Sequence, residues 1–198
     1  MLNGFQCSFS EKRLGTLDRN LTGDRLVVRA KESELGDIIT DIMKEKAHAD
    51  IALLNGGSIR QGLKKGEISE RAIYSVFPFT DTLVIAPMTG AQIQELLDLF
   101  AEKGTGGGGF LQVSGLSFKI FKGSALEIKI NGKPLNKKKV YTVALNSFLA
   151  DGGDGYSMLR TLKKKKNTGY GLPALLVEYV RIHKALPRPK MNRFSIVK

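Results

Sequence analysis

The stretch Ile51-Ala-Leu-Leu-Asn-Gly-Gly-Ser-Ile-Arg60 joins a short apolar run directly to a pair of glycines. Four apolar residues bounded by a turn signal are typical of a short buried strand. The glycines can adopt backbone torsion angles that other residues avoid, so they let the chain approach a ligand closely. Because α/β proteins bind ligands where strands end, residues 55–60 are a first candidate for a binding loop.

The segments on either side alternate between helix and strand patterns. Helices are expected after the capping residues Ser33, Ser69 and Thr89 and around Pro173, because apolar residues follow one helical face there. Asn131-Gly132 is a strong signal for a hairpin turn. Strands are expected at residues 25–30, 51–54, 82–86, 110–113, 116–120, 126–130 and 140–145. This interleaving predicts an α/β domain in which helices are layered on mixed sheets.

Length and composition exclude several classes of protein. A chain of 198 residues is expected to form a single domain spanning residues 1–198. With 42% hydrophobic and 25% charged residues, the composition argues against a disordered chain. No apolar run is long enough for a membrane segment, and residues 1–13 lack the pattern of a secretory signal. Cys7 is the single cysteine, which excludes an internal disulfide and a cysteine zinc site.

The positive charge is concentrated near the end of the chain. The formal net charge is +12, and residues 160–198 hold eleven basic residues against one acidic residue. Lys163, Lys164, Lys165 and Lys166 form a continuous run without an interleaved aromatic residue. The run is therefore interpreted as a solvated loop, with a nucleic-acid contact kept as an alternative.

Further motifs follow in order along nearly the whole chain. They are Leu14-Gly15, Leu17-Asp18, Arg29, Leu35-Gly36-Asp37, Asn55-Gly-Gly-Ser-Ile-Arg60, Phe77-Pro-Phe79, Thr89-Gly90, Gly109-Phe-Leu-Gln-Val-Ser-Gly115, Asn131-Gly-Lys-Pro-Leu135, Asn146-Ser-Phe-Leu-Ala-Asp-Gly-Gly-Asp-Gly-Tyr156 and Asn192-Arg193-Phe194. Together they resemble the C-terminal domain of the 5′-nucleotidase family, which includes ecto-5′-nucleotidases and periplasmic UDP-sugar hydrolases. The resemblance implies a substrate-recognition domain whose partner, a separate N-terminal metallophosphoesterase domain absent from this chain, holds two divalent metal ions. It also implies export to the periplasm or cell surface.

The resemblance assigns roles to six residues. In that family two phenylalanines sandwich the base, and by position they correspond to Phe79 and Phe148. We expect the two rings to face each other about 7 Å apart, with room for one base between them. Each stack contributes roughly 1–3 kcal/mol.

The remaining four residues are polar. Arg29 and Arg60 correspond to the family's substrate-binding arginines, whose guanidinium groups suit phosphate oxygens or another anion. Asn55 corresponds to an asparagine that contacts the base, and Asp154 to an aspartate that accepts hydrogen bonds from ribose hydroxyls.

Four positions in these motifs depart from the family pattern. Asp37 and Asp151 stand where asparagine is usual, Thr80 where glycine is usual, and Asp81 where asparagine or glycine is usual. Thr80 adds a side chain beside the expected base site. A third arginine, which some members place near the glycine pair, is not identified from the sequence.

The chain lacks the residues that phosphate-ester cleavage would need. A two-metal site requires about half a dozen Asp, His and Asn ligands. His48 and His183 are the only histidines, and neither lies in a metal-binding motif. We therefore expect no catalytic residue and no cofactor here, and an inactive chain on its own. The alternatives are a free-standing nucleoside-binding module and a nucleic-acid binder that uses the lysine run, whose affinity would fall steeply with salt.

Overall fold

The computed structural model describes residues 12–197, and Cys7 lies outside the described residues. The helices are α1 (Arg25–Val28), α2 (Glu34–Lys46), α3 (Glu70–Val76), α4 (Gly90–Lys103), α5 (Ser147–Ala150), α6 (Ser157–Arg160) and α7 (Leu172–His183). The strands are β1 (Arg13–Leu17), β2 (Ile51–Asn55), β3 (Gly66–Ser69), β4 (Thr82–Thr89), β5 (Leu111–Ser114), β6 (Leu116–Phe121), β7 (Ser124–Ile130), β8 (Lys133–Pro134), β9 (Val140–Asn146), β10 (Lys166–Gly171) and β11 (Phe194–Val197). None of the helices in this part of the chain is both long enough and apolar enough to cross a membrane.

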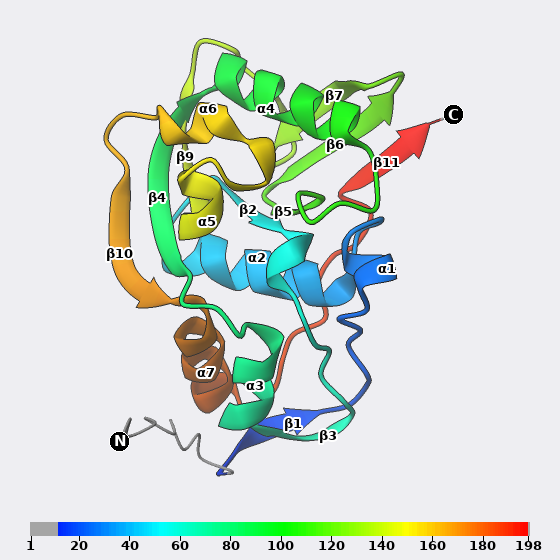
Figure 1. The fold of residues 1–198 in the computed structure, drawn as a ribbon, viewed down its shortest axis with the longest axis vertical. Helices are drawn as coiled ribbons and strands as arrows, with labels where there is room; N and C mark the ends of the chain where they lie inside the picture. The colour runs from blue at the N-terminus through cyan, green and yellow to red at the C-terminus, as the bar shows by residue number, and fades with distance from the viewer. Residues whose placement is uncertain (1–11, 198) are drawn as a thin grey trace, which may run out of the picture.

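A five-stranded sheet in the order β10-β4-β9-β2-β5 forms the centre of the domain. The neighbours β2 and β9 run parallel, and the other neighbours run antiparallel. Figure 1 shows α4 at the upper end of the molecule, and α3, α7 and the β1–β3 ribbon at the lower end. The predicted fold class, an α/β domain with helices layered on mixed sheets, is confirmed.

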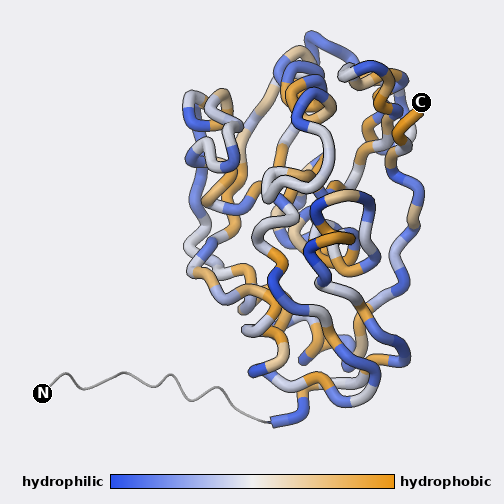
Figure 2. Tube along the Cα trace, turned by 45° about the vertical axis from the view of Figure 1, so that its right-hand side comes forward, coloured by the Kyte–Doolittle hydropathy of each residue, from blue (hydrophilic) through white to orange (hydrophobic). Residues whose placement is uncertain are grey.

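Two hydrophobic cores lie on the two faces of this central sheet. Ile51 and Leu53 pack into the first, the α4 core, which contains α4 and strands β6 and β7. Ala52 and Leu54 pack into the second, the α2 core, which contains α2, α3 and α7. Because both faces are covered, β2 is apolar from Ile51 to Leu54, with no polar alternate positions before its last residue, Asn55. Figure 2 shows the apolar stretches (orange) along the interior strands and the polar stretches (blue) in outer loops.

Two smaller sheets complete the fold. Strands β11-β6-β7-β8 form a four-stranded sheet in which β11 pairs parallel with β6. The hairpin predicted at Asn131-Gly132 joins β7 to β8, and Ile130 pairs with Lys133 across it. Strands β1 and β3 form a separate antiparallel pair.

One predicted element is wrong. Residues 25–30 were expected to form a strand, but Arg25–Val28 form the helix α1. The Asp24 side chain caps this helix by accepting a hydrogen bond from the Leu26 N–H. A four-residue helix buries one apolar residue, Val28, which is too little to give a periodic pattern in the sequence.

Candidate functional site

Four loops meet at one edge of the central sheet. Since β2 and β9 are parallel neighbours, their last residues, Asn55 and Asn146, lie at the same edge. The antiparallel strands β4 and β5 begin there, with Leu83 paired to Asn146 and Leu111 paired to Asn55. The sheet therefore brings together residues 55–60, 77–82, 104–110 and 146–155, which are far apart in the sequence.

These loops surround a cavity of about 690 Å³. The cavity is lined by Arg29, Asn55, Gly57, Ser58, Arg60, Pro78, Phe79, Thr80, Asp81, Gly108, Phe148 and Asp154. All six residues singled out from the sequence are in this lining. Their place in one cavity is a finding, whereas the individual roles in ligand binding stay predictions.

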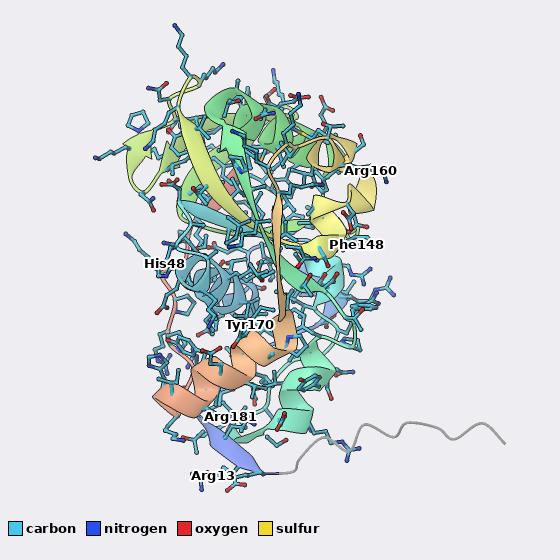
Figure 3. The ribbon with its side chains drawn as sticks, turned by 90° about the vertical axis from the view of Figure 1, so that its left-hand side faces the viewer. Arg13, His48, Phe148, Arg160, Tyr170 and Arg181 are labelled. Atoms are coloured by element: carbon cyan, nitrogen blue, oxygen red, sulfur yellow. The ribbon has the colours of Figure 1, made fainter. Side chains whose placement is uncertain are left out.

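Phe79 and Phe148 are unusually exposed for phenylalanine. Each of these residues is 43% exposed, although most large apolar side chains of the domain are buried. The Phe148 ring lies directly over Gly153, where any Cβ atom would come within 2.4 Å of the ring. The Arg60 guanidinium lies 4.9 Å from the centre of the Phe79 ring. Figure 3 shows Phe148 on the α5 segment at the surface of the domain.

A buried hydrogen-bond network forms the floor beside the rings. Asn55 donates from Nδ2 to the Asp154 carboxylate at 2.8 Å. Its Oδ1 accepts hydrogen bonds from Ser58 Oγ at 2.7 Å and from Asn146 Nδ2 at 3.1 Å. Both polar ends of the Asn55 side chain therefore have protein partners. Its bond to Asp154 holds that carboxylate in the lining of the cavity.

Asp154 has a backbone conformation that few residues adopt. Its φ of 52° lies in the left-handed region, which aspartate and asparagine tolerate better than most residues. Conformations of this kind persist where surrounding structure enforces them, and they gather at functional sites. Here Asn55 donates a hydrogen bond to the Asp154 carboxylate, and the chain passes so near Asp154 that a Cβ atom at Gly109 would lie 3.0 Å from the Asp154 Cβ atom.

A second, more polar cavity of about 350 Å³ adjoins the first through Arg29 and Arg60. Arg25 also lines it and gives this cavity three guanidinium groups. The buried Nε of Arg29 has no hydrogen-bond partner among the described residues. This pair of cavities is well suited to a ligand with an aromatic part and an anionic part.

Arg25 was not identified from the sequence. It lies four residues before Arg29, a spacing that places two side chains on one face of a helix. The signal was missed because residues 25–30 were expected to form a strand.

A family model described as "5′-nucleotidase, C-terminal domain" matches residues 13–161. The chain belongs to this family. As a 5′-nucleotidase C-terminal domain it is also similar to larger proteins. It is 33% identical over 174 residues to Protein UshA of Yersinia enterocolitica, a match that covers 88% of this chain and 32% of that protein. It is 39% identical over 174 residues to the trifunctional nucleotide phosphoesterase protein YfkN of Bacillus subtilis, covering 80% of this chain and 12% of that protein.

Solved structures agree with these matches. The 5′-nucleotidase precursor of Thermus thermophilus superposes with a TM-score of 0.87 at 32% identity, covering 95% of this chain and 40% of that one. The NAD nucleotidase of Haemophilus influenzae shares the fold at 17% identity, with a TM-score of 0.82. The 5′-nucleotidase C-terminal domain described here therefore spans less than half the length of each of these relatives.

The two histidines lie outside the cavity lining. Both His48 and His183 are exposed, and His183 stacks on Tyr179 with ring centres 4.2 Å apart. In Figure 3, His48 and Phe148 lie on opposite sides of the view. Within residues 12–197, no group of three or more His, Cys, Asp or Glu side chains could hold a metal ion.

The lysine run is only partly a solvated loop. Lys163, Lys164 and Lys166 are exposed, and Lys166 begins β10. Lys165 instead donates from Nζ to the backbone carbonyl groups of Ala150, Leu159 and Arg160. The prediction of a solvated loop is therefore wrong for Lys165, because the last carbonyl groups of α5 and α6 attract its cation.

Proposed function

We propose that this domain binds the nucleoside part of a nucleotide in the 690 Å³ cavity and presents its phosphate ester to a separate hydrolase domain. The base would stack between Phe79 and Phe148, and the ribose would bond to Asp154. The phosphate would face Arg29 and Arg60, with Arg25 as an additional cation. By the family resemblance, the expected N-terminal domain would hold two divalent metal ions that polarise the ester, and the whole protein would be a 5′-nucleotidase.

The observation that carries this proposal is the exposure of two phenylalanine rings that line one cavity, one from the loop before β4 and one from the short helix α5. Leaving 43% of a ring accessible forgoes part of the stabilisation that burial would give. Aromatic faces presented to a cavity suit a nucleobase, because every base has a π face. The guanidinium groups in the adjoining cavity suit the anionic end of the same ligand.

Titration of the 198-residue chain with adenosine, followed by NMR, tests the proposal. The dissociation constant should be on the order of 0.1–10 mM, since two stacks are offset by the cost of immobilising the ligand. Phe79→Ala and Phe148→Ala should each weaken binding by about 1–3 kcal/mol. Phe121→Ala, which removes a partly exposed ring outside the cavity lining, is the matched control and should leave the affinity unchanged.

Two results would refute the base clamp. One is unchanged adenosine affinity in both cavity variants. The other is a ligand-bound structure in which the base contacts neither ring. A separate assay of the chain with and without added divalent metal should show no phosphatase turnover above background.

A further inference from the structure

Asp81 links the two loops that carry Phe79 and Phe148. Its carboxylate oxygen Oδ1 accepts hydrogen bonds from Ser147 Oγ at 3.0 Å and from the Phe148 backbone N–H at 3.3 Å. Its Oδ2 accepts a hydrogen bond from Asn146 Nδ2 at 3.3 Å. We propose that Asp81 is a positioning residue that fixes the spacing of the two rings, an inference that rests on the proposed function.

The shortness of α5, which carries Phe148, explains why this segment needs a hydrogen-bond partner from elsewhere in the chain. It has four residues, and its capping residue Asn146 makes no side-chain hydrogen bond to the helix. A helix of this length is unstable alone, and its first N–H groups lack internal acceptors. The Asp81 carboxylate supplies an acceptor for the Phe148 N–H and adds a favourable charge at this end of the helix.

The other side of the link is firmly anchored. The Asp81 carbonyl accepts a hydrogen bond from the Leu172 N–H at 3.0 Å, at the start of α7. The next residue, Thr82, begins β4 and donates its N–H to Ser147 Oγ at 3.1 Å. Asp81 is thus held by the sheet and by α7, and Phe79 lies only two residues before it.

The position of Asp81 in the cavity makes the link relevant to a ligand. Asp81 is half-buried and lines the same cavity as both rings. Without its carboxylate, the first turn of α5 would lose the acceptor of the Phe148 N–H, and the ring would sample other positions. A base would then have to restore the spacing on binding, at a cost in affinity.

Four variants of the whole chain test this inference with adenosine titrations. Asp81→Ala should weaken binding about tenfold, the effect of losing hydrogen bonds worth roughly 1.4 kcal/mol. Asp81→Asn keeps an oxygen acceptor and should stay within about threefold of the parent affinity. Ser147→Ala removes a bridging hydroxyl and should cost about threefold. Asp151→Ala, an exposed aspartate three residues after Phe148 and outside the cavity lining, is the control and should have no effect.

A double variant separates positioning from direct contact. In a Phe148→Ala background, Asp81→Ala should weaken adenosine binding less than about twofold, because the ring that it positions is gone. The Phe148 backbone amide signal should broaden or shift in Asp81→Ala but stay in place in Asp81→Asn. An equal loss of affinity with and without Phe148 would overturn the inference, as would full affinity in Asp81→Ala. Full affinity in both phenylalanine variants would instead overturn the proposed function, so the two failures are distinguishable.

Discussion

The domain places phenylalanine in two opposite settings. Phe100, Phe110 and Phe118 are almost completely buried in the α4 core and meet edge to face, with Phe100 5.1 Å from Phe110 and 6.1 Å from Phe118. Phe79, in the loop before β4, and Phe148, in the short helix α5, line the cavity and stay 43% exposed. The buried rings pack against one another, whereas the faces of the two cavity rings are open to a ligand. The difference shows that the position of a phenylalanine in the fold, inside the α4 core or at the cavity edge of the central sheet, decides whether its ring is buried or exposed.

Two aspartates also have opposite surroundings, one with several hydrogen-bond donors and one with none in the part of the chain that the structure describes. Asp81 at the cavity accepts hydrogen bonds from three groups. Asp37 on α2 is fully buried, and neither of its oxygens has a hydrogen-bond partner within the described residues. Burial raises the pKa of Asp37 to about 9, and Glu32 and Asp41 act in the same direction, against the attraction of Arg193 Nε at 3.5 Å. Asp37 is therefore held as a neutral acid at pH 7.

Replacing one interior ring should have the largest effect. Phe118→Ala should lower the free energy of unfolding by about 3–5 kcal/mol, because it opens a hole among Phe100, Phe194 and their neighbours. Phe79→Ala and Phe148→Ala should lower it by no more than about 1 kcal/mol. Chemical denaturation of the three variants measures this. If the cavity variants unfold at as low a denaturant concentration as Phe118→Ala, the cavity phenylalanines contribute to stability as much as the core phenylalanine does.

The buried carboxyl group of Asp37 makes the stability of the domain depend on pH. Since the pKa of Asp37 rises from 3.8 in the unfolded chain to about 9 in the folded one, the folded state binds more protons. Its contribution to stability is complete below about pH 4 and is lost progressively as the pH rises toward 9.

Asp37→Asn should remove this dependence. The variant should be more stable than the parent by about 5 kcal/mol at pH 8 and nearly equal to it at pH 4, because roughly four pH units separate the two conditions at about 1.4 kcal/mol per unit. Thermal melts from pH 4 to pH 9 check the prediction, with Asp151→Asn as the exposed control. Parallel curves for the parent and Asp37→Asn would contradict it.

The cavity arginines should affect the binding of a ligand that carries a phosphate more than the binding of one that does not. Arg60→Met should weaken AMP binding by about 1.5 kcal/mol more than adenosine binding at low salt, because charge-assisted hydrogen bonds to the phosphate are lost. Arg181→Met removes an exposed arginine of α7 far from the cavity lining and should leave both affinities unchanged. Equal losses for AMP and adenosine would place Arg60 beside the base rather than the phosphate.

The smallest expected effect concerns the lysine run. Lys165→Met should lower the free energy of unfolding by about 1 kcal/mol, because it leaves carbonyl groups at the ends of α5 and α6 without their cation. Changing Lys163, Lys164 and Lys166 together to serine should alter stability by less than about 0.5 kcal/mol and should leave adenosine affinity unchanged. Denaturation and titration of both proteins measure this. A tenfold loss of affinity in the triple variant would make these lysines part of the site.

The sequence predicted those elements that carry their own start signals. Ser33 and Thr89 cap α2 and α4 as expected, and Thr89 forms a reciprocal capping box with Gln92. Strands β1, β3, β10 and β11 were not predicted, because their pairing partners lie elsewhere in the chain and the residues of β3, β10 and β11 are mostly exposed. The pattern of β10, Lys-Asn-Thr-Gly-Tyr-Gly, carries almost no strand signal of its own.

The residues of the candidate site also fall into two groups, those found from the sequence and those found only in the structure. The family resemblance singled out six residues that all line the cavity, and their roles in binding stay predictions. The roles of Arg25 and Asp81 depend on contacts between segments, such as the bonds from Ser147 and Phe148 to a carboxylate more than sixty residues earlier. A local pattern cannot predict such contacts, because they exist only once the antiparallel strands β4 and β9 have placed the start of one beside the end of the other.

The central sheet also determines how the domain can tolerate change. The α4 core and the α2 core lie on opposite faces and share the sheet between them. Residues that share no packing partner generally have additive energetic effects, within about 0.3–0.5 kcal/mol. Substitutions at Phe118 in one core and Leu35 in the other should accordingly show little epistasis. Directed evolution could repack one core at a time without searching for compensating changes in the other.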